Sequence, residues 1–333
     1  MADLYRLPSG PVNEDEKVHV VIGASGGTGR ALVRELRERG RRVRAVNRSG
    51  RADVPPGVEV VAADARDADR MREVCRGAVV VYNAVNPPFR QWREAFPAAV
   101  DGVLAGAESS GARMVFVDDT WMYGHTTGRM TEDLPYRPIS NKGVLRAWLA
   151  ERVLAAHESG RVQTVIGRAP ELYGPAVESL LGSNIFGPAA HGGLAVWIGD
   201  LDQPLTPMFI DDFAHGLAEL GEREEAFGAV WHIPTPEPTT ARRLLSLVAK
   251  RSQQRMHVMR IREPAVRALG VVWPIARDGA EMLYQFRQPH AIDSSKYRNA
   301  FGPGRVTPYE EGIDRTLDWY RARPRRGLTT LGR

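Results

Sequence analysis

Short apolar runs alternate with amphipathic segments along the first half of the chain. The runs at 17–24 and 78–85 are almost continuously apolar, which is typical of strands buried on both faces of a sheet. Segment 27–40 has apolar residues at helical spacing and closes on Gly40. Strands separated by helices of about 10–15 residues predict right-handed crossovers, and so a doubly wound parallel sheet with helices on both faces. Further strands are predicted at 41–48, 58–65, 112–119 and 161–170, and further helices at 67–77, 88–111 and 141–160.

The pattern becomes irregular after about residue 170, where many Gly and Pro residues interrupt it. One more strand is predicted at 229–234 and two more helices at 239–251 and 306–323. The helical region 88–111 contains Pro97, and we expect its helix to start or break there. These patterns predict an α/β protein with a first, dinucleotide-binding domain at 17–175. A smaller irregular part at 176–322 is expected to bind the substrate and to send some segments back to the first domain. The tails at 1–16 and 323–333 are expected to be flexible.

The composition excludes several classes of protein. It is ordinary for a globular chain, with 43% hydrophobic and 26% charged residues. No run of 18 apolar residues occurs and no secretory signal is recognised, so no membrane span or leader is expected. Cys75 is the only cysteine, which favours the cytoplasm. The net charge is +5, but aromatic residues do not interleave with the basic clusters, so no nucleic-acid partner is expected. The histidines lack metal-ligand spacing, and no metal site is predicted.

The segment VVIGASGGTGRAL carries the first candidate chemistry, because its glycines follow the first strand and open the first helix. A tight glycine turn lets a pyrophosphate approach bare backbone N–H groups at the positive end of a helix, where side chains would block it. The alternative is that the glycines serve a tight turn without a ligand. The strand before the loop and the helix after it favour a Rossmann-type dinucleotide site. The residues predicted to form it are Gly23, Ser25, Gly26, Gly27, Thr28 and Gly29.

The end of the second strand indicates which dinucleotide binds. An acidic residue there would bond the 2′-hydroxyl of the ribose and repel a 2′-phosphate. This chain has Asn47 at that place, followed by Arg48. A guanidinium can neutralise a 2′-phosphate through paired hydrogen bonds. The sequence therefore favours NADP(H) over NAD(H), although Arg48 could also be an ordinary solvated arginine.

With these motifs in order, the chain resembles the extended short-chain dehydrogenases/reductases, and within them the NAD-dependent epimerase/dehydratase family. GASGGTG matches the family's G-x-x-G-x-x-G loop, VVAADARD its third-strand segment and RAPELYGP its R-P-x-x-x-Y-G-P segment. The resemblance implies an oxidoreductase or epimerase that acts on a small molecule, and it suggests a homodimer. It also implies that Asp64 and Ala65 lie near the adenine and that Pro170 and Leu172 lie near the nicotinamide, and Ala84 is predicted to bind the cofactor with them.

The chain departs from the family at the active site. The family has Ser or Thr five residues before the glycine of Tyr-Gly, and a Tyr-x-x-x-Lys motif on the next helix. Its Tyr is the acid/base, and its Lys lowers the pKa of that Tyr and holds the ribose. Here Asp119 stands at the hydroxyl position, Lys142 at the tyrosine and Arg146 at the lysine. The nearest tyrosine before Lys142 is Tyr136, in a Pro-rich loop. These replacements predict a variant active site.

Three functions are consistent with this site. In the first, an NADP(H)-dependent oxidoreductase or epimerase acts on a small carbonyl or hydroxyl compound. Lys142 protonates the carbonyl oxygen and also contacts the cofactor, Thr120 or Asp119 orients the substrate, and Arg146 holds the ribose. In the second, Asp119 and Lys142 perform non-redox cyclisation, isomerisation or elimination. In the third, the chain is a catalytically silent nucleotide-binding sensor, and the charges form structural ion pairs. The residues predicted to line the substrate site are Trp121, Tyr123, Tyr136 and Tyr173.

Overall fold

A seven-stranded parallel sheet forms the centre of the molecule. The computed structural model describes residues 17–177, 179, 181–261 and 281–323. The strand order is β11-β6-β5-β4-β1-β2-β3, and it reverses between β1 and β4, which is the switch point of a doubly wound sheet. The predicted fold class is therefore confirmed. The strands are β1 (Val18–Ile22), β2 (Arg42–Asn47), β3 (Glu59–Ala62), β4 (Ala78–Asn83), β5 (Arg113–Asp118), β6 (Thr164–Arg168) and β11 (Val230–His232).

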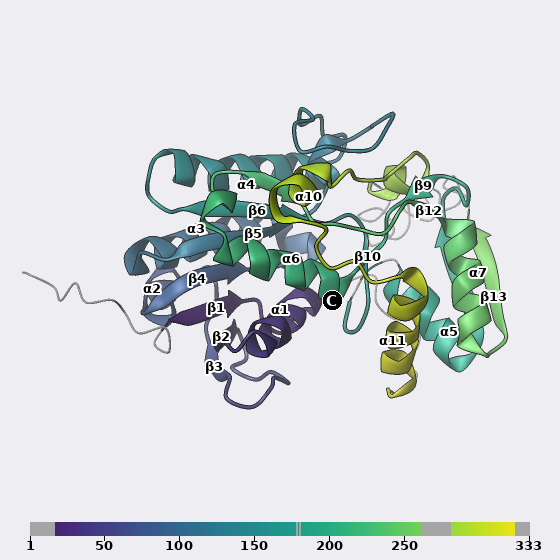
Figure 1. Cartoon of the computed structure of the whole chain (residues 1–333), viewed down its shortest axis with the longest axis horizontal. Helices are drawn as coiled ribbons and strands as arrows, with labels where there is room; N and C mark the ends of the chain where they lie inside the picture. Colours follow the sequence, from purple (N-terminus) through teal and green to yellow (C-terminus); the bar gives the residue numbers. More distant parts are fainter. Residues whose placement is uncertain (1–16, 178, 180, 262–280, 324–333) are drawn as a thin grey trace, which may run out of the picture.

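Helices cover both faces of this sheet (Figure 1). On one face α1 (Gly27–Glu38) packs against α6 (Ile210–Glu222). On the other face α3 (Trp92–Ser110) packs between α2 (Ala68–Val74) and α4 (Asn141–Glu158). Each face has its own apolar core cluster. Burial from both sides explains why the central strands are continuously apolar.

Helix α3 runs through Pro97, so the predicted start or break at this residue is wrong. The helix begins at Trp92, whose indole N–H donates to the carbonyl of Pro87 (2.7 Å). Because Pro97 has no N–H, the carbonyl of Arg93 loses its helical partner. Trp92 and Phe96 are buried against the sheet, and the burial of these large side chains offsets that loss.

The C-terminal part stands beside the first domain, on the right of Figure 1. Its longest strands among the described residues, β8 (Gly193–Ile198) and β13 (Met256–Ile261), form a parallel pair. Nearby, α7 (Ala241–Ser252) packs against α11 (Tyr309–Arg321). The chain between β8 and α7 returns to the central sheet as α6 and β11. A division of the chain at residue 175 stays a prediction.

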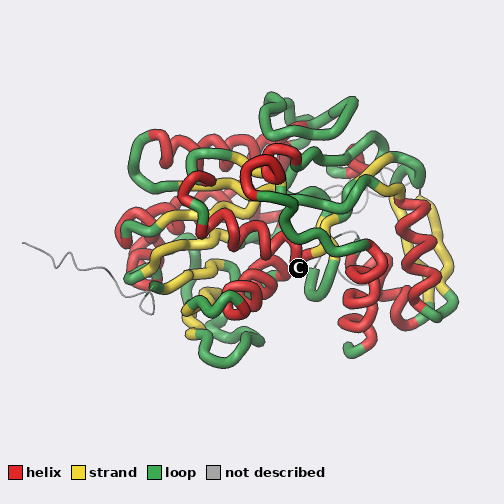
Figure 2. The backbone as a smooth tube through the Cα atoms, viewed as in Figure 1, coloured by secondary structure: helices red, strands yellow, loops and turns green. Residues whose placement is uncertain are grey.

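Short elements and long loops connect the two parts (Figure 2). The predicted tail 1–16 and residues 324–333 of the other tail lie outside the described residues. Within the described ranges, no helix has both the length and the apolar character needed to cross a bilayer. The shorter elements are β7 (Leu172–Tyr173), β9 (Pro204–Leu205), β10 (Met208–Phe209), β12 (Thr239–Thr240), α5 (Gly187–His191), α10 (Ser295–Phe301), η2 (Phe89–Gln91), η3 (Trp121–Tyr123), η4 (Gly182–Phe186), η5 (Glu224–Ala226) and η6 (Leu283–Phe286).

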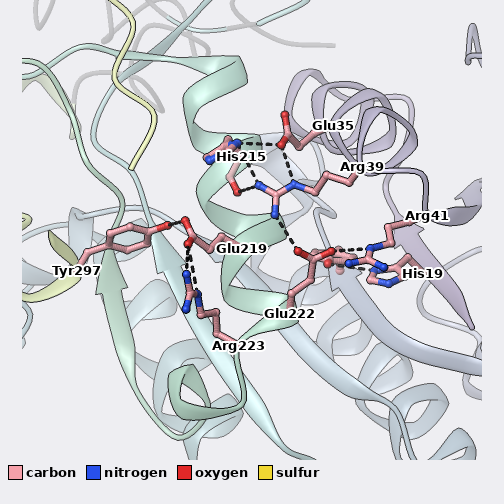
Figure 3. Close-up of polar contacts among 10 residues, drawn as sticks. His19, Glu35, Arg39, Arg41, His215, Glu219, Glu222, Arg223 and Tyr297 are labelled. Carbon is pink, nitrogen blue, oxygen red and sulfur yellow. Dashed lines mark hydrogen bonds and ion pairs between the residues drawn. The ribbon is translucent and has the colours of Figure 1, made fainter. Parts of the chain in front are cut away.

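A network of charged side chains joins α1 to α6 near the start of β2 (Figure 3). We call Glu35, Arg39, Arg41, His215 and Glu222 the α1–α6 network. Arg39 donates to Glu35 (2.8 Å) and to Glu222 (2.8 Å), and Arg41 donates to Glu222 (2.8 Å). The ring of His215 lies 2.9 Å from Glu35. Because these side chains come from α1, from α6 and from the turn between α1 and β2, the network ties both helices to the start of β2.

Candidate active site at the carboxyl edge of the sheet

The glycine loop follows β1 and packs tightly against the neighbouring strands. Gly23 has φ +86° and donates its N–H to the carbonyl of Val46 (2.9 Å). A Cβ on Gly23 would lie 2.5 Å from the carbonyl oxygen of Ala84, and a Cβ on Gly29 would lie 2.3 Å from that of Gly23. Side chains are therefore excluded at both positions, which places the backbone of β1, β4 and α1 in direct contact.

The opening of α1 suits the pyrophosphate of a dinucleotide. Gly26 precedes the helix without a side-chain cap, so no side chain occupies the N–H groups of the first turn. Ser25 and Gly26 are exposed, while Thr28 is half-buried in that turn. A Cβ on Gly27 would lie 2.9 Å from the carbonyl oxygen of Ala176, so the chain after β7 reaches the loop. The loop residues thus fit a phosphate group in the way that the sequence predicts.

The residues predicted near the ribose and adenine lie after β2 and β3. Asn47 is buried, and its Oδ1 accepts from the amide (3.0 Å) and hydroxyl (2.9 Å) of Ser49. Asn47 thereby shapes the turn that carries Arg48, and Arg48 is exposed. Asp64 is paired with Arg66 (2.5 Å), and this bonding lowers the pKa of Asp64 to about 2. Ala65 is buried.

Two adjacent carboxylates, at the last residue of β5 and the residue after it, share one guanidinium. Asp118 is buried and accepts from Arg168 Nε (2.9 Å), and it lies 3.4 Å from Arg146 Nη1. Asp119 Oδ2 lies 2.8 Å from Arg146 Nε, but this contact is an ion pair without hydrogen-bond geometry. Arg146 is buried between the rings of Trp92 (4.7 Å) and Phe96 (4.6 Å). Its guanidinium therefore faces the strand end.

Asp119 is the carboxyl group of this edge that titrates near neutral pH. Burial raises the pKa of Asp119 to about 6. The carboxylate of Asp118 contributes to this rise, whereas Arg146 and the amide of Trp121 (2.9 Å from Oδ1) oppose it. The Asp119 side chain keeps 18% of its surface exposed, so solvent reaches it. Such a group can both give and accept a proton at physiological pH.

Lys142 lies at the start of α4 and is nine-tenths buried. Ser140 caps this helix by accepting from the amide of Gly143 (3.0 Å). A Cβ on Gly143 would lie 2.6 Å from the carbonyl oxygen of Trp121, so glycine allows α4 to approach η3. The ammonium of Lys142 forms an ion pair with Glu281, and it lies 5.2 Å from the centre of the Phe89 ring.

The other predicted polar residues are held by partners outside the strand end. The hydroxyl of Thr120 is buried and bonds to His290 Nε2 (3.0 Å). The indole of Trp121 donates to Gln285 (3.2 Å) and stacks on the ring of Trp92. Gln285 belongs to η6, so the C-terminal part covers this side of the site.

Arg168 organises the tyrosines predicted to face the substrate. It is completely buried and donates to the hydroxyls of Tyr123 (2.7 Å) and Tyr136 (2.6 Å). Nδ1 of His232 donates to a carbonyl (3.0 Å), so Nε2 accepts from the hydroxyl of Tyr123 (2.8 Å). Burial lowers the pKa of His232 to about 3, so its ring is neutral. Tyr173 is completely buried in the core of the C-terminal part, and the structure does not bring it into this cluster.

The residues predicted near the nicotinamide lie at the same edge. Ala84 follows β4 and touches the glycine loop, Pro170 follows β6 and is buried, and Leu172 pairs with Met208 across β7 and β10. The cofactor roles of these residues stay predictions.

Sequence reasoning missed Arg168, His232, Glu281, Gln285 and His290. Arg168 had a signal, since a charged residue ends an otherwise apolar strand (TVIGR). Glu281 had none, because its contact with Lys142 spans 139 residues. Its surroundings in the sequence show no motif.

Known proteins match nearly the whole chain. A 2-alkyl-3-oxoalkanoate reductase from Stenotrophomonas maltophilia (strain K279a) is 26% identical over 323 residues, which cover 89% of this chain and 97% of the relative. A dTDP-glucose 4,6-dehydratase from Streptomyces venezuelae, solved with NAD, has a TM-score of 0.74 and 20% identity over 92% of this chain and 97% of that chain. A Thermus thermophilus UDP-glucose 4-epimerase complex with NAD also has a TM-score of 0.74, with 18% identity over 94% of this chain and 100% of that chain.

The family assignment follows from the sequence match. The sequence model described as the NAD dependent epimerase/dehydratase family matches residues 19–232. This match includes the glycine loop, the end of β5 and the start of α4, which are parts of the site described above. The chain therefore belongs to the NAD dependent epimerase/dehydratase family, which confirms the resemblance and the prediction of an enzyme on a Rossmann-type fold.

Proposed function

We propose that this protein is an NADP(H)-dependent oxidoreductase that interconverts a small carbonyl compound and its alcohol, with Asp119 as the acid and base. The observation that carries the proposal is the carboxyl group of Asp119, partly exposed at the end of β5 and with a pKa raised to about 6. The reductase relative supports a redox reaction over epimerisation or dehydration.

The proton step follows from the contacts of Asp119. When bound, the nicotinamide supplies or accepts a hydride. During reduction, the protonated carboxyl of Asp119 donates to the carbonyl oxygen and becomes a carboxylate. Arg146, whose Nε lies 2.8 Å from Oδ2, stabilises that negative charge because a guanidinium stays protonated. Asp118 cannot take this role, since it is buried and held by Arg168.

Our sequence hypothesis gave the proton to Lys142. Its ammonium is paired with Glu281 and stands one helical turn before Arg146. We therefore assign Lys142 to binding and Asp119 to proton transfer. The loop from Gly23 to Gly29 is the proposed holder of the pyrophosphate.

The pH dependence of turnover tests the role of Asp119. Carbonyl reduction requires the protonated carboxyl, so kcat/KM for reduction should be constant below pH 6 and fall about tenfold per pH unit above it. Alcohol oxidation requires the carboxylate and should rise up to about pH 6. Following the cofactor's absorbance with a panel of carbonyl compounds measures both directions. A reduction rate that rises above pH 6 would exclude Asp119 as the acid.

Substitution of Arg48 tests the preference for NADPH over NADH. The exposed guanidinium after β2 suits a 2′-phosphate. Arg48→Ala should weaken NADPH binding by about 10–100-fold, the loss expected for a hydrogen bond to a charged group, and leave NADH binding unchanged. Calorimetric titration of both dinucleotides measures this. Equal loss for NADH and NADPH would contradict the preference.

A second candidate function is a nucleotide-binding protein without turnover. One observation favours it: Lys142, Arg146 and Arg168 are each already paired with a carboxylate. Tight binding of NADPH, with no change in the cofactor or in any compound of the panel, would support this candidate. Turnover of a compound with the cofactor unchanged would instead indicate non-redox acid/base chemistry.

A further inference from the structure

Lys142 differs from the other cations of the site in the origin of its carboxylate partner. Arg146 and Arg168 pair with Asp118 and Asp119, which belong to the end of β5 itself. Among the described residues, Lys142 pairs with Glu281, which comes from the C-terminal part and keeps 24% of its side chain exposed. Replacement of this carboxylate by another leaves the charge balance unchanged. It therefore avoids the cost of a buried ammonium without a partner.

An apolar surface borders the same ammonium. Phe89 is 43% exposed, although its ring lies only 5.2 Å from Lys142 Nζ. The rings of Trp92 (5.1 Å between centroids) and Trp121 (6.1 Å) lie against Phe89, and the two indoles stack on each other. These fixed rings offer apolar contact to a ligand at a small cost in side-chain entropy. A ligand at this place therefore meets a positive charge next to an apolar surface.

The spacing along α4 relates this charge to the proposed proton donor. Lys142 and Arg146 are one turn apart, so their side chains start about 5–6 Å from each other on one face of the helix. Arg146 in turn contacts Asp119. The side chain that ends in the Lys142 ammonium and the side chain that contacts Asp119 thus start about one helical turn apart. In a short oxo acid, only one or two carbon bonds separate the carboxylate from the carbonyl group, which is a span of the same order.

We propose that the substrate is a small oxo acid or the corresponding hydroxy acid, whose carboxylate replaces Glu281 on Lys142. Phe89 and Trp121 hold its apolar chain, and Asp119 exchanges the proton of its oxygen. The inference rests on the proposed oxidoreductase function. In the reducing direction a 3-oxo acid, NADPH and a proton give a 3-hydroxy acid and NADP⁺. The carbonyl carbon gains a C–H bond, its oxygen gains the proton, and the C=O π bond breaks.

Comparing each oxo acid with its amide tests whether the enzyme recognises the carboxylate of the substrate. With NADPH, we expect kcat/KM for 3-oxohexanoate to exceed that for 3-oxohexanamide by about 10–100-fold, the effect of a hydrogen bond to a charged group. In Lys142→Gln this ratio should fall to about one. Glu281→Gln removes the competing carboxylate, so it should lower KM for the acid several-fold and leave KM for the amide unchanged. Equal use of acid and amide by the wild-type enzyme would overturn the inference and leave the oxidoreductase function standing.

Binding without turnover separates this inference from the proposed function. In calorimetry, the protein with NADP⁺ should bind hexanoate more tightly than hexanamide, and Lys142→Gln should remove the difference. Longer carboxylates should bind up to about fourfold more tightly per added CH₂ group, because the chain lies on apolar surface. If hexanoate binds in this way while no oxo compound is reduced, the carboxylate site stands and the redox function fails. If hexanoate and hexanamide bind equally and neither oxo compound is reduced, both proposals fail.

Discussion

Two clusters of charged side chains, at different places around the same sheet, use the same residue types with opposite results. At the end of β5, burial raises the pKa of Asp119 to about 6. In the α1–α6 network, burial also acts to raise the pKa of Glu35, but hydrogen bonds with His215 and Arg39 lower it to about 2. One carboxyl group can therefore exchange its proton at neutral pH, whereas the other stays ionised.

The number of cations around each carboxylate explains the difference. Asp119 must share Arg146 with the adjacent carboxylate of Asp118. Glu35 has two guanidinium groups beside it, those of Arg39 at 2.8 Å and Arg305 at 3.5 Å, and a hydrogen-bond partner in the ring of His215 at 2.9 Å. One cation shared between two carboxylates does not offset the cost of burying the charge of Asp119. The partners of Glu35 together more than offset the same cost, so its pKa falls. We infer that the first cluster is arranged for proton transfer and the second for holding helices together.

The largest expected effect is on turnover in Asp119→Asn. This change removes the proposed acid, so kcat should fall by about 10²–10⁴-fold. Stability at pH 7 should not fall, because a raised pKa means that ionised Asp119 costs folding free energy above its pKa. Steady-state kinetics and urea unfolding of the same preparation measure both. If the Asp119→Asn protein keeps its activity, or unfolds at lower urea than the wild type, the end of β5 is not arranged for proton transfer and the distinction between the two clusters fails.

The opposite result is expected in the α1–α6 network. Glu35→Gln removes one of the two carboxylates that pair with Arg39, and should lower the free energy of unfolding by about 1.5–3 kcal/mol, the loss expected for a hydrogen bond to a charged group, while kcat stays unchanged. Arg41→Ala is the matched control. The Arg41 side chain is 40% exposed and Glu222 keeps Arg39, so the loss should be under about 1 kcal/mol. Equal losses in the two variants would show that the pair of Glu35 and Arg39 contributes no more to stability than the partly exposed Arg41 does.

The prediction with the smallest effect at neutral pH concerns the acid side of the stability curve. Burial lowers the pKa of His19, which lies beside Tyr82 at the edge of this network (Figure 3), to about 4. The unfolded chain binds this proton near pH 6.5, so stability is complete above that pH and is lost as the pH falls from 6.5 to 4. His19→Asn should flatten this part of the curve in urea unfolding at several pH values. Turnover between pH 6.5 and 8 should be unaffected, and a changed profile there would link the two clusters.

The sequence predicted the geometry of the glycine loop well, because that geometry is local. Gly23 and Gly29 lie six residues apart, and the steric reasons for glycine act within one strand–loop–helix unit. The positions of Lys142 and Arg146 on one helix face were also correct from spacing alone. The proton donor that we propose was less predictable, since the pKa of Asp119 depends on burial and on which carboxylates share Arg146.

What the sequence by itself determined is the doubly wound sheet, the glycine loop and the charged residues that replace the family's hydroxyl, tyrosine and lysine. Periodicity and short-range spacing carry that information because hydrogen bonds within helices and crossovers between strands are local. Only the tertiary structure decided how the charges combine. It brought Glu281 onto Lys142 and Arg168 onto Asp118, contacts across 139 and 50 residues. Pairing and burial act through space, and they set which carboxyl group holds a proton.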